Sequence, residues 1–536
     1  MSIPTLAMIP SGYKAKKVYS VLPTDGSGDL KFSRTTNGTR VNQNGLIETV
    51  AGDVPRLDYT DGSCPSLLLE PSSINLITQS ESFANTYWNK SGASIQGDAS
   101  TAGAEKATNG NFASSSDWAI VNSDSNATSA IANGYLKLKT SGIFTQASQN
   151  MSLVVGNTYK LTYEILSSDG GNLGLVNSNN ITTLIPSSVG FHTIYFQPNN
   201  GTFALKRYSG ALDVQIDNIS IKEVSGFSAP SVDSPLSAFK LVEDTSTGSH
   251  YIATPTVSVS SGSSVTNSIF AKKGERDWIR LWSFDLTTDW STYFNLDTGT
   301  IGTVQSGTTA SMEHIGNGWY KCSITYVNNH TGALFYPYIA QADNVKTYTG
   351  DGTSGVYIFG AQVEQNSSAT SYIPTSGTTI SRTADSASKS GISSLIGQTE
   401  GVLYLSYKNK TTSSTEYISL SDGTDANSIR IFWNVLNQMG VSILVGGGSV
   451  YSDTVTDNYS NVTDMKVAIK YKSGDYAIFI NGVRKGFSTT ITSPPLTSIL
   501  AANRGASAGF LYKDIKDLRV YNQILTDAEL TTLTTI

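Results

Sequence analysis

The stretch MKVAIKYKSGDYAIFINGVRKG, residues 465–486, decides the fold class because it holds two strand-turn-strand signals in succession. Val467, Ile469 and Tyr471 occupy alternate positions, which is typical of a strand with one buried face. The positions between them are expected to face solvent: Lys466, Ala468, Lys470 and Lys472. KSGD then turns the chain, YAIFI returns it, and an Asn-Gly pair turns it again. The stretch therefore predicts a three-stranded meander.

Similar short strands, separated by turns rich in Gly, Asn, Asp and Ser, continue along the 536 residues. Only 15% of the residues are charged, against about 25% in ordinary globular proteins, and 48 are glycines. The length suggests roughly three or four domains of about 150 residues each. We expect an all-β protein of several β-sandwich domains of jelly-roll or lectin-like type, one of them inserted in another.

The charge balance excludes some partners. A formal net charge of −6 argues against nucleic acid and anionic membranes, since both reward dense Lys and Arg clusters.

The first residues lack a cationic segment followed by an apolar run, and no stretch approaches about 20 apolar residues, so neither a signal peptide nor a membrane span is expected. Cys64 and Cys322 show no metal-ligand spacing, and both are expected to be buried.

The C-terminal end holds a clear helix start. In LTDAELTTL, Thr526 is an N-cap and Glu529 follows three residues later, as in a capping box. IKDLRVYNQIL directly before it is expected to be a strand. Together with the meander, this order resembles the end of a concanavalin-A/laminin-G-like lectin sandwich, which would span residues 391–536.

Two further modules precede it. The opening NGNFASSSDW and the close LDVQIDNISIKEV resemble a β-sandwich of the carbohydrate-binding-module type, placed at residues 105–225. The segments on either side of this module are residues 73–100 and 229–385, and the apolar alternation of the first resumes in the second as though nothing intervened. This predicts one split β-sandwich with the other module inserted in a surface loop.

The N-terminal part, residues 1–72, is expected to be an extended, hairpin-rich segment that attaches the protein to a virion. In SRTTNGTRVNQNGLIETV, residues 33–50, Asn37-Gly38 and Asn44-Gly45 favour tight hairpin turns. Because an isolated two-stranded hairpin is marginal in water, this ribbon must lie against something larger.

Five segments carry a further resemblance: LKFSRTTNGTRVNQNGLIETV, VPRLDY, CPSLLLEPSSINLITQSESF and, much later, GAQVEQNSSATSYIPT and SRTAD. Together they resemble a family of tailed-phage virion proteins, among them tail fibres, head fibres and tail-associated lectin-like proteins. The resemblance covers about residues 10–100 and 230–385. It implies a protein made in the host cytoplasm and carried on the exterior of the virion. Its implied partners are other virion proteins and host-surface glycans, and by analogy with fibres and spikes we expect a homotrimer.

Catalytic signals are weak. The four histidines form no H-x-x-x-H pair. A glycosidase needs two carboxylates flanking one bond, but Glu400, Glu416 and Glu529 stand apart. Glu275 and Asp277 of ERDW are better explained as a solvated edge. We therefore predict no catalysis.

Sugar binding is expected where an exposed ring lies beside hydrogen-bonding side chains. The candidates in EYISLSDGTDANSIRIFWN of the C-terminal sandwich are Tyr417, Asp422, Asp425, Asn427, Arg430 and Trp433. Those in the inserted module are Trp118 and Tyr208. A plainer interpretation, which we favour for Trp433, places that ring in the core and makes Asp422-Gly423 an ordinary turn.

No cofactor is expected, although the carboxylates of DGTD and DGSGD leave Ca²⁺ open. Three functions therefore compete: a virion protein whose lectin-like modules bind glycans, a purely structural collar or capsid decoration, and a polysaccharide depolymerase. An exposed aromatic groove would favour the first of these.

Overall fold

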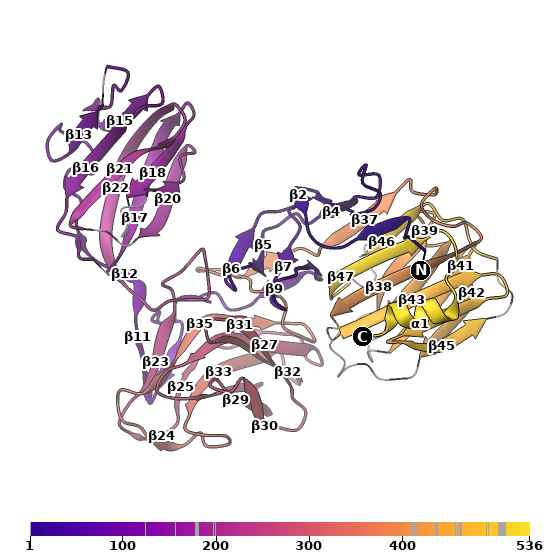
Figure 1. The fold of residues 1–536 in the computed structure, drawn as a ribbon. Coiled ribbons are helices and arrows are strands. Elements are labelled where there is room, and N and C mark those ends of the chain that lie inside the picture. Colours follow the sequence, from indigo (N-terminus) through magenta and orange to yellow (C-terminus); the bar gives the residue numbers. More distant parts are fainter. Residues whose placement is uncertain are drawn as a thin grey trace. The chain divides into compact units, whose positions relative to one another are not determined.

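The computed structural model describes residues 2–536 except 124, 156, 177–181, 197, 199, 409, 411–414, 435–437, 456, 458, 460–463, 489, 491 and 502–510. Within the described residues the fold is all-β, as expected, apart from one short helix, α1 (Asp527–Thr534). The chain divides into two compact units. Unit 1 comprises Met1–Gln96, Ala229–Ser234 and Phe239–Ile536, and unit 2 comprises Gly97–Ser228 and Pro235–Ala238. Figure 1 shows the fold and labels many of the strands of both units.

One part of unit 1 is a sandwich of two antiparallel sheets with a shared apolar core. Its eight-stranded sheet runs β45-β44-β43-β38-β47-β8-β7, with β1 beside β47. These strands are β1 (Leu6–Met8), β7 (Leu57–Asp58), β8 (Ser66–Leu69), β38 (Glu400–Lys408), β43 (Asp464–Lys472), β44 (Tyr476–Ile480), β45 (Val483–Ser488) and β47 (Lys513–Tyr521). The nine-stranded sheet consists, in order, of β2 (Tyr13–Lys14), β3 (Lys17–Val18), β4 (Leu30–Ser33), β37 (Ser386–Ser390), β46 (Ser498–Ala501), β39 (Glu416–Ser421), β40 (Ser428–Trp433), β41 (Met439–Val445) and β42 (Gly448–Val455).

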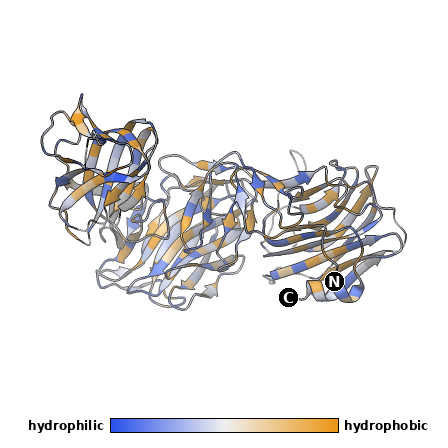
Figure 2. Ribbon diagram, turned by 45° about the horizontal axis from the view of Figure 1, so that its top comes forward, coloured by the Kyte–Doolittle hydropathy of each residue, from blue (hydrophilic) through white to orange (hydrophobic). Residues whose placement is uncertain are grey.

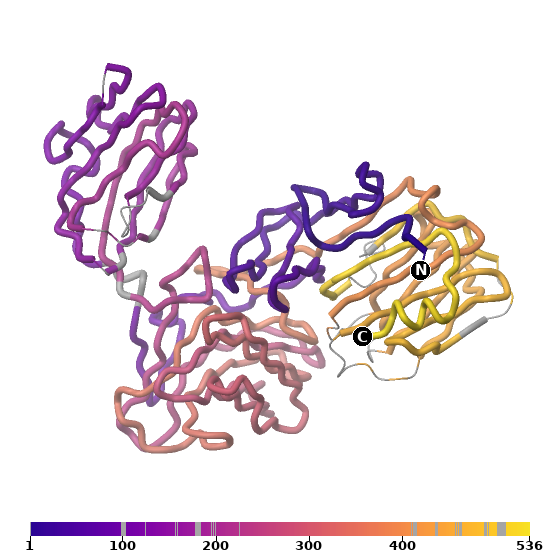
Figure 3. Tube along the Cα trace, in the orientation of Figure 1, coloured from indigo at the N-terminus to yellow at the C-terminus, as the bar shows by residue number. Residues whose placement is uncertain are grey.

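The N-terminal segment, residues 1–72, was expected to be extended and to lie against something larger, and it is built into this sandwich. Six of its short strands join the sheets of this sandwich: Leu6 pairs with Val520, for example, and Leu67 with Ile515. Figure 3 shows the indigo N-terminal tube beside the orange and yellow strands. The physical reason is that an open sheet edge exposes unpaired N–H and C=O groups, which an added strand satisfies.

The ribbon of residues 33–50 contains one hairpin, β5 (Gly38–Val41) with β6 (Ile47–Val50). Gly45 lies in its turn with φ +71°, as the Asn-Gly pair predicted. Gly38, in contrast, belongs to β5, so the expectation of a second tight turn there is wrong.

Buried charges hold this ribbon in place. Arg34, Arg56 and Arg382 have fully buried side chains, as do the carboxylates of Glu70 and Asp385. Nη1 of Arg56 and Nη1 of Arg382 both donate to Oε2 of Glu70, at 2.6 and 2.5 Å. Asp385 accepts from Arg34 at 3.0 Å and also from Arg56. We call these five residues the ion cluster.

The predicted meander is confirmed, since β43, β44 and β45 pair in succession. Its predicted solvent-facing side is not, because Ala468 and Lys470 are buried. Ala468 belongs to a small second core that includes Leu530 of α1, so the helix covers this face of the sheet. The capping box is confirmed: Thr526 Oγ1 accepts from Glu529 N at 3.2 Å, and Glu529 Oε2 accepts from Thr526 N at 2.9 Å.

The other part of unit 1 is the split sandwich. Its seven-stranded sheet runs β10-β25-β33-β28-β29-β30 with β26 beside β33. These strands are β10 (Asn89–Ser91), β25 (His250–Ala253), β26 (Val257–Ser258), β28 (Trp278–Phe284), β29 (Asp289–Asn295), β30 (Thr300–Val304) and β33 (Gly332–Ala340). The facing sheet consists, in order, of β11 (Ala93–Gln96), β23 (Phe239–Glu243), β35 (Gly355–Glu364), β27 (Ser264–Lys273), β32 (Trp319–Val327) and β31 (Thr309–Gly316). Two small pairs accompany them: β24 (Thr247–Gly248) with β34 (Tyr348–Thr349), and β9 (Ser73–Asn75) with β36 (Ile380–Arg382).

Figure 2 shows hydrophobic and hydrophilic residues interspersed along the strands, as layered sheets require. Cys322 is buried in the core of the split sandwich, as expected. Cys64 is exposed, so the expectation of burial is wrong for it. Cys64 lies in the hydrophilic turn between β7 and β8, where no apolar face covers it.

Unit 2 is a sandwich with its own core. One sheet runs β14-β15-β22-β17-β20 with β12 beside β22, and its strands are β12 (Asp98–Glu105), β14 (Ala130–Ala132), β15 (Tyr135–Thr140), β17 (Thr158–Ser168), β20 (Gly190–Phe196) and β22 (Leu212–Ser225). The other consists, in order, of β13 (Ala119–Asn122), β16 (Thr145–Asn150), β21 (Thr202–Ser209), β18 (Asn172–Val176) and β19 (Thr182–Ile185). In unit 1 the strand before the insertion, β11, ends at Gln96, and it pairs with β23, the first strand after the insertion. Gln96 and Lys240 are register partners in this pair.

Candidate functional site

The outward face of the seven-stranded sheet carries aromatic side chains where a sandwich ordinarily presents polar ones. In β28, Ile279 and Leu281 belong to the core of the split sandwich. Because side chains alternate between the two faces of a strand, Arg280, Trp282 and Phe284 point outward.

The neighbouring strands follow the same rule. In β33, Phe335 and Ile339 belong to the core, so Tyr336 and Tyr338 share the outward face. In β25, Ile252 is a core residue and Tyr251 is outward. β33 lies between β25 and β28, which brings the outward rings of three strands side by side.

The strand register sets the contacts among these rings. Tyr251 is opposite Tyr338, and their ring centroids are 4.5 Å apart. Trp282 is opposite Tyr336, at 4.4 Å, and is stacked on Phe284 at 5.7 Å with an interplanar angle of 7°. We call Tyr251, Trp282, Phe284, Tyr336 and Tyr338 the aromatic platform. Tyr338 is buried among the other rings, whereas the remaining four are half-buried.

Polar contacts fix the platform and border it. Trp282 Nε1 donates to Asp289 Oδ2 on β29 at 2.9 Å, which sets the orientation of the indole. At one edge, Ser91 of β10 is opposite Tyr251. At the other, Ser291 of β29 is opposite Trp282. Hydroxyl and carboxylate groups therefore flank the rings on the same face.

A strained turn extends the apolar surface beside the platform. Leu286, in the turn after β28, has φ +80° and is 53% exposed. Asp285 holds this turn, since its Oδ1 accepts from Thr288 N at 2.7 Å and its Oδ2 from Asn329 N at 2.8 Å. A bulky residue in this backbone region is rare.

Most of the residues predicted from the sequence lie elsewhere. Trp433 is 2% exposed and sits in the core of the C-terminal sandwich, where its Nε1 donates to Tyr407 Oη at 2.8 Å. Trp118 is 6% exposed and packs in the core of unit 2, 5.4 Å from Phe112. Because each ring faces inward, neither can stack on a sugar, and both are withdrawn as candidates. The core position favoured for Trp433 is confirmed.

The polar candidates of the C-terminal sandwich build a turn. Asp422 accepts from Thr424 Oγ1 at 2.6 Å and from Asn427 Nδ2 at 2.7 Å, and the Thr424 hydroxyl is the main reason that the pKa of Asp422 lies below its usual value. Arg430 donates to Asp425 O at 2.9 Å, and its guanidinium lies 5.5 Å from the Tyr417 ring. Tyr417 and Arg430 share the outward face of their sheet, so the structure brings this pair together. Tyr208 of unit 2 is 47% exposed.

The acidic residues considered as metal ligands or catalytic groups have nearby partners in the described residues. Nowhere among them do three His, Cys, Asp or Glu side chains gather so as to hold a metal ion. In DGSGD, Asp25 accepts from Ser27 N, and Asp29 accepts from Ser20 N and Lys17. Glu275 lies in a turn rather than on a strand and binds Lys240 at 2.6 Å. No helix in the described part of the chain is long and apolar enough to cross a membrane.

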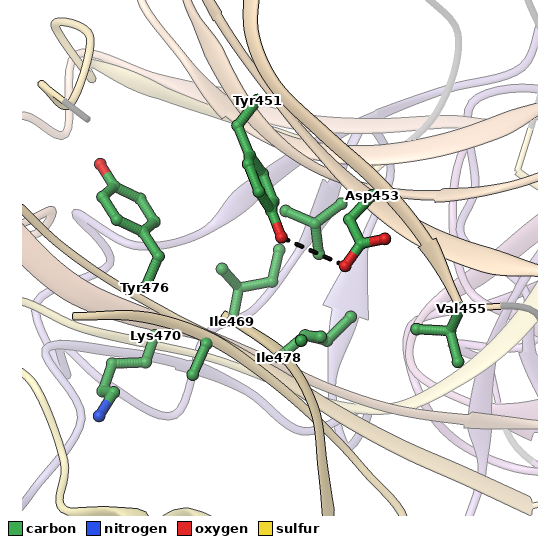
Figure 4. A pocket seen from close by; sticks show the side chains of 10 residues that line it. Tyr451, Asp453, Val455, Ile469, Lys470, Tyr476 and Ile478 are labelled. Atoms are coloured by element: carbon green, nitrogen blue, oxygen red, sulfur yellow. Dashed lines mark hydrogen bonds between the residues drawn. The ribbon is translucent and has the colours of Figure 1, made fainter. Parts of the chain in front are cut away.

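A small apolar pocket opens in the C-terminal sandwich between β42 and the meander (Figure 4). Its volume of about 10 Å³ corresponds to one water molecule. Tyr451 Oη donates to Asp453 Oδ2 across it, at 3.2 Å. The pocket is too small for a sugar ring.

Fold and site together define an all-β protein of sandwich domains, one of which displays an aromatic platform on a sheet face. No family model matches the chain, and no curated protein matches it. Among solved structures, a Ruminococcus gnavus IT-sialidase CBM40 bound to alpha2,3 sialyllactose is 19% identical, with a TM-score of 0.23, over 26% of this chain and 84% of that one. The tandem CBM22-1-CBM22-2 domains of Paenibacillus barcinonensis Xyn10C are 11% identical, with a TM-score of 0.17, over 56% and 99%. Domains LG4-5 of the mouse laminin alpha1 chain are 9% identical, with a TM-score of 0.17, over 52% and 85%.

Sequence reasoning missed the platform, although a signal was present. WIRLWSF and LFYPYI place large side chains on both alternating sets of positions, which is typical of a strand covered on both faces. Only the register of β25, β33 and β28 shows that one set gathers on an outward face.

Proposed function

We propose that this chain is a non-catalytic, glycan-binding protein on the exterior of a bacteriophage particle, and that it binds host-surface glycans during adsorption. The observation that carries the glycan-binding part is the aromatic platform. Sugar rings present apolar C–H faces beside hydroxyl groups. Rings such as Trp282 and Tyr251, bordered by Asp289 and Ser91, offer surfaces for both.

The virion part of the proposal is supported by the sequence motifs, whose role in the fold is specific. SRTT supplies Arg34, VPRLDY supplies Arg56, LLLEP supplies Glu70, and SRTAD supplies Arg382 and Asp385. Each motif thus contributes a side chain to the ion cluster. The resemblance to phage virion proteins therefore concerns the scaffold, which can carry different binding surfaces.

Oligomerisation belongs to the same proposal. Single shallow sugar sites bind weakly, and a closed symmetric oligomer multiplies them through avidity. We propose a homotrimer, which sedimentation at particle-like concentrations would test; a monomer there would contradict the fibre role.

Trp282→Ala and Tyr336→Ala in the full chain test the binding role, with Phe191→Ala as the matched control for an exposed ring in unit 2. We expect each platform variant to lose at least tenfold in binding to an array of bacterial surface polysaccharides, about 1.4 kcal/mol, and to adsorb poorly to host cells. Phe191→Ala should bind as the wild type does. Unchanged binding by a folded Trp282→Ala, Tyr336→Ala double variant would leave the purely structural role. Release of shorter oligosaccharides from a bound polysaccharide would favour the depolymerase.

A further inference from the structure

A guanidinium lies among the rings of the aromatic platform. Arg280 occupies the outward position of β28 next to Trp282 and is only 4% exposed. Its Cζ is 5.1 Å from the ring centroid of Tyr338 and 5.7 Å from that of Trp282. Tyr293 of β29 adds a third ring at 5.6 Å. The cation is therefore surrounded by ring faces, which attract it through their quadrupoles.

The hydrogen-bonding capacity of Arg280 is incompletely used. Neither Nε nor Nη1 has a hydrogen-bond partner among the described residues, although both atoms are buried. Asp289, on the adjacent strand, accepts from Trp282 Nε1. The buried arginines of the ion cluster differ, since each of them contacts a carboxylate.

A buried guanidinium with open donors is suited to one class of ligand. Arg remains charged at any physiological pH, and its planar fork of N–H donors matches the geometry of a carboxylate. In surroundings of low dielectric, such a charge-assisted pair is stronger than hydrogen bonds to neutral hydroxyls.

We infer that the aromatic platform selects acidic sugars, whose ring stacks on Trp282 and Tyr336 while the carboxylate pairs with the open Nε and Nη1 donors of Arg280. The inference rests on the proposed glycan-binding function and adds the substrate class. Uronic and sialic acids share this chemistry. Because neighbouring rings cover the two nitrogen atoms, a platform ring must rotate to admit the carboxylate, and tryptophan fluorescence should change on binding.

The test compares charged and neutral forms of the same polymer, using the full chain. The uronate probe is polygalacturonate with its methyl ester, and the sialate probe is polysialic acid with its carboxyl-reduced form. We expect at least tenfold tighter binding of one charged polymer than of its neutral form. The preference should weaken at 0.5 M NaCl, since salt screens the pair. The polymer that shows the preference identifies the source of the carboxylate.

Arg280→Met should abolish the preference while retaining binding to the neutral form, and Arg280→Lys should keep part of it. Arg484→Met, which removes the same charge from the C-terminal sandwich, is the matched control and should behave as the wild type does. Melting temperatures show whether the Arg280 variants are folded. If Arg280→Met unfolds, the comparison of charged and neutral polymers on the wild type still tests whether the platform selects acidic sugars. Equal binding of both forms overturns the inference but leaves glycan binding intact. Absence of binding to all four polymers, with Trp282→Ala indistinguishable from the wild type on the polysaccharide array, overturns both.

Discussion

Arg34 and Asp385, separated by 351 positions in the sequence, form an ion pair of 3.0 Å with both side chains fully buried. Further bonds satisfy Arg34, whose Nη2 donates to the carbonyls of Ala51 at 2.8 Å and Val50 at 3.2 Å. Asp385 in turn accepts from the backbone N–H of Glu70 at 2.9 Å. The pair therefore ties the N-terminal ribbon to the segment that follows the split sandwich.

Asp385→Asn should strongly destabilise unit 1. The change leaves Arg34 and Arg56 buried without their shared carboxylate, and breaking a buried pair in this way costs about 3–5 kcal/mol. Urea unfolding followed by circular dichroism measures the loss. Asp213→Asn, which removes a partly exposed partner of Lys137 and Lys139, is the control and should have little effect. Equal stability of Asp385→Asn and the wild type would show that the ion cluster is dispensable.

The ion cluster should also make stability depend on acid. Burial opposes ionisation of Glu70, but Arg382 and Arg56 hold its pKa well below the usual value. Because the pKa is lower in the folded than in the unfolded state, this stabilisation is fully present above the unfolded value of about 4.3 and is lost as the pH falls below it. Urea midpoints between pH 7 and pH 3 should therefore decline in the wild type. Glu70→Gln should be less stable at pH 7 and decline less; parallel curves for the two proteins would contradict this assignment.

Local sequence signals predicted local structure well. The alternation around Val467 and Ile469 gave the meander, and Thr526 with Glu529 gave the start of α1. Burial of Lys470 was not predictable in the same way, because the covering helix lies more than fifty residues further along the chain. The pairing of Arg34 with Asp385 spans an even longer separation, so no local pattern indicates it.

The candidate site was not predictable from the sequence for a related reason. The turn signals near Trp433 and Trp118 favour exposed rings, but both rings point into a core. The platform arises instead from cross-strand neighbours such as Tyr251 and Tyr338, whose proximity depends on the register of separate strands. Alternation along a strand shows which residues share a face. It does not show which of the two faces is covered by the rest of the protein.

Unit 2 should be separable from the chain. It has its own core, and in unit 1 Gln96 and Lys240 are register partners in neighbouring antiparallel strands. Replacing residues 98–226 by a short Gly/Ser linker should therefore leave unit 1 folded, and the excised module should fold alone. Circular dichroism and melting curves of both proteins check this. An insoluble remainder together with an unfolded module would contradict the assignment of two units.

The two tryptophans Trp282 and Trp433 should respond in opposite ways to truncation. Trp433 is fully enclosed in the core of the C-terminal sandwich, so Trp433→Ala should cost about 3–5 kcal/mol and reduce binding only through unfolding. Trp282 is half-buried on the platform, with one side still accessible, so Trp282→Ala should lower the melting temperature much less while removing most glycan binding. Thermal melts and polysaccharide binding should be measured on the same preparations, with Trp282→Phe as the variant that keeps an aromatic ring but lacks the Nε1 donor to Asp289. Retained binding in Trp282→Phe would assign the contribution to stacking, whereas loss in both variants would assign it to the fixed orientation of the indole. If Trp282→Ala unfolds the protein as Trp433→Ala does, the ring is a core residue and the platform is not the binding surface.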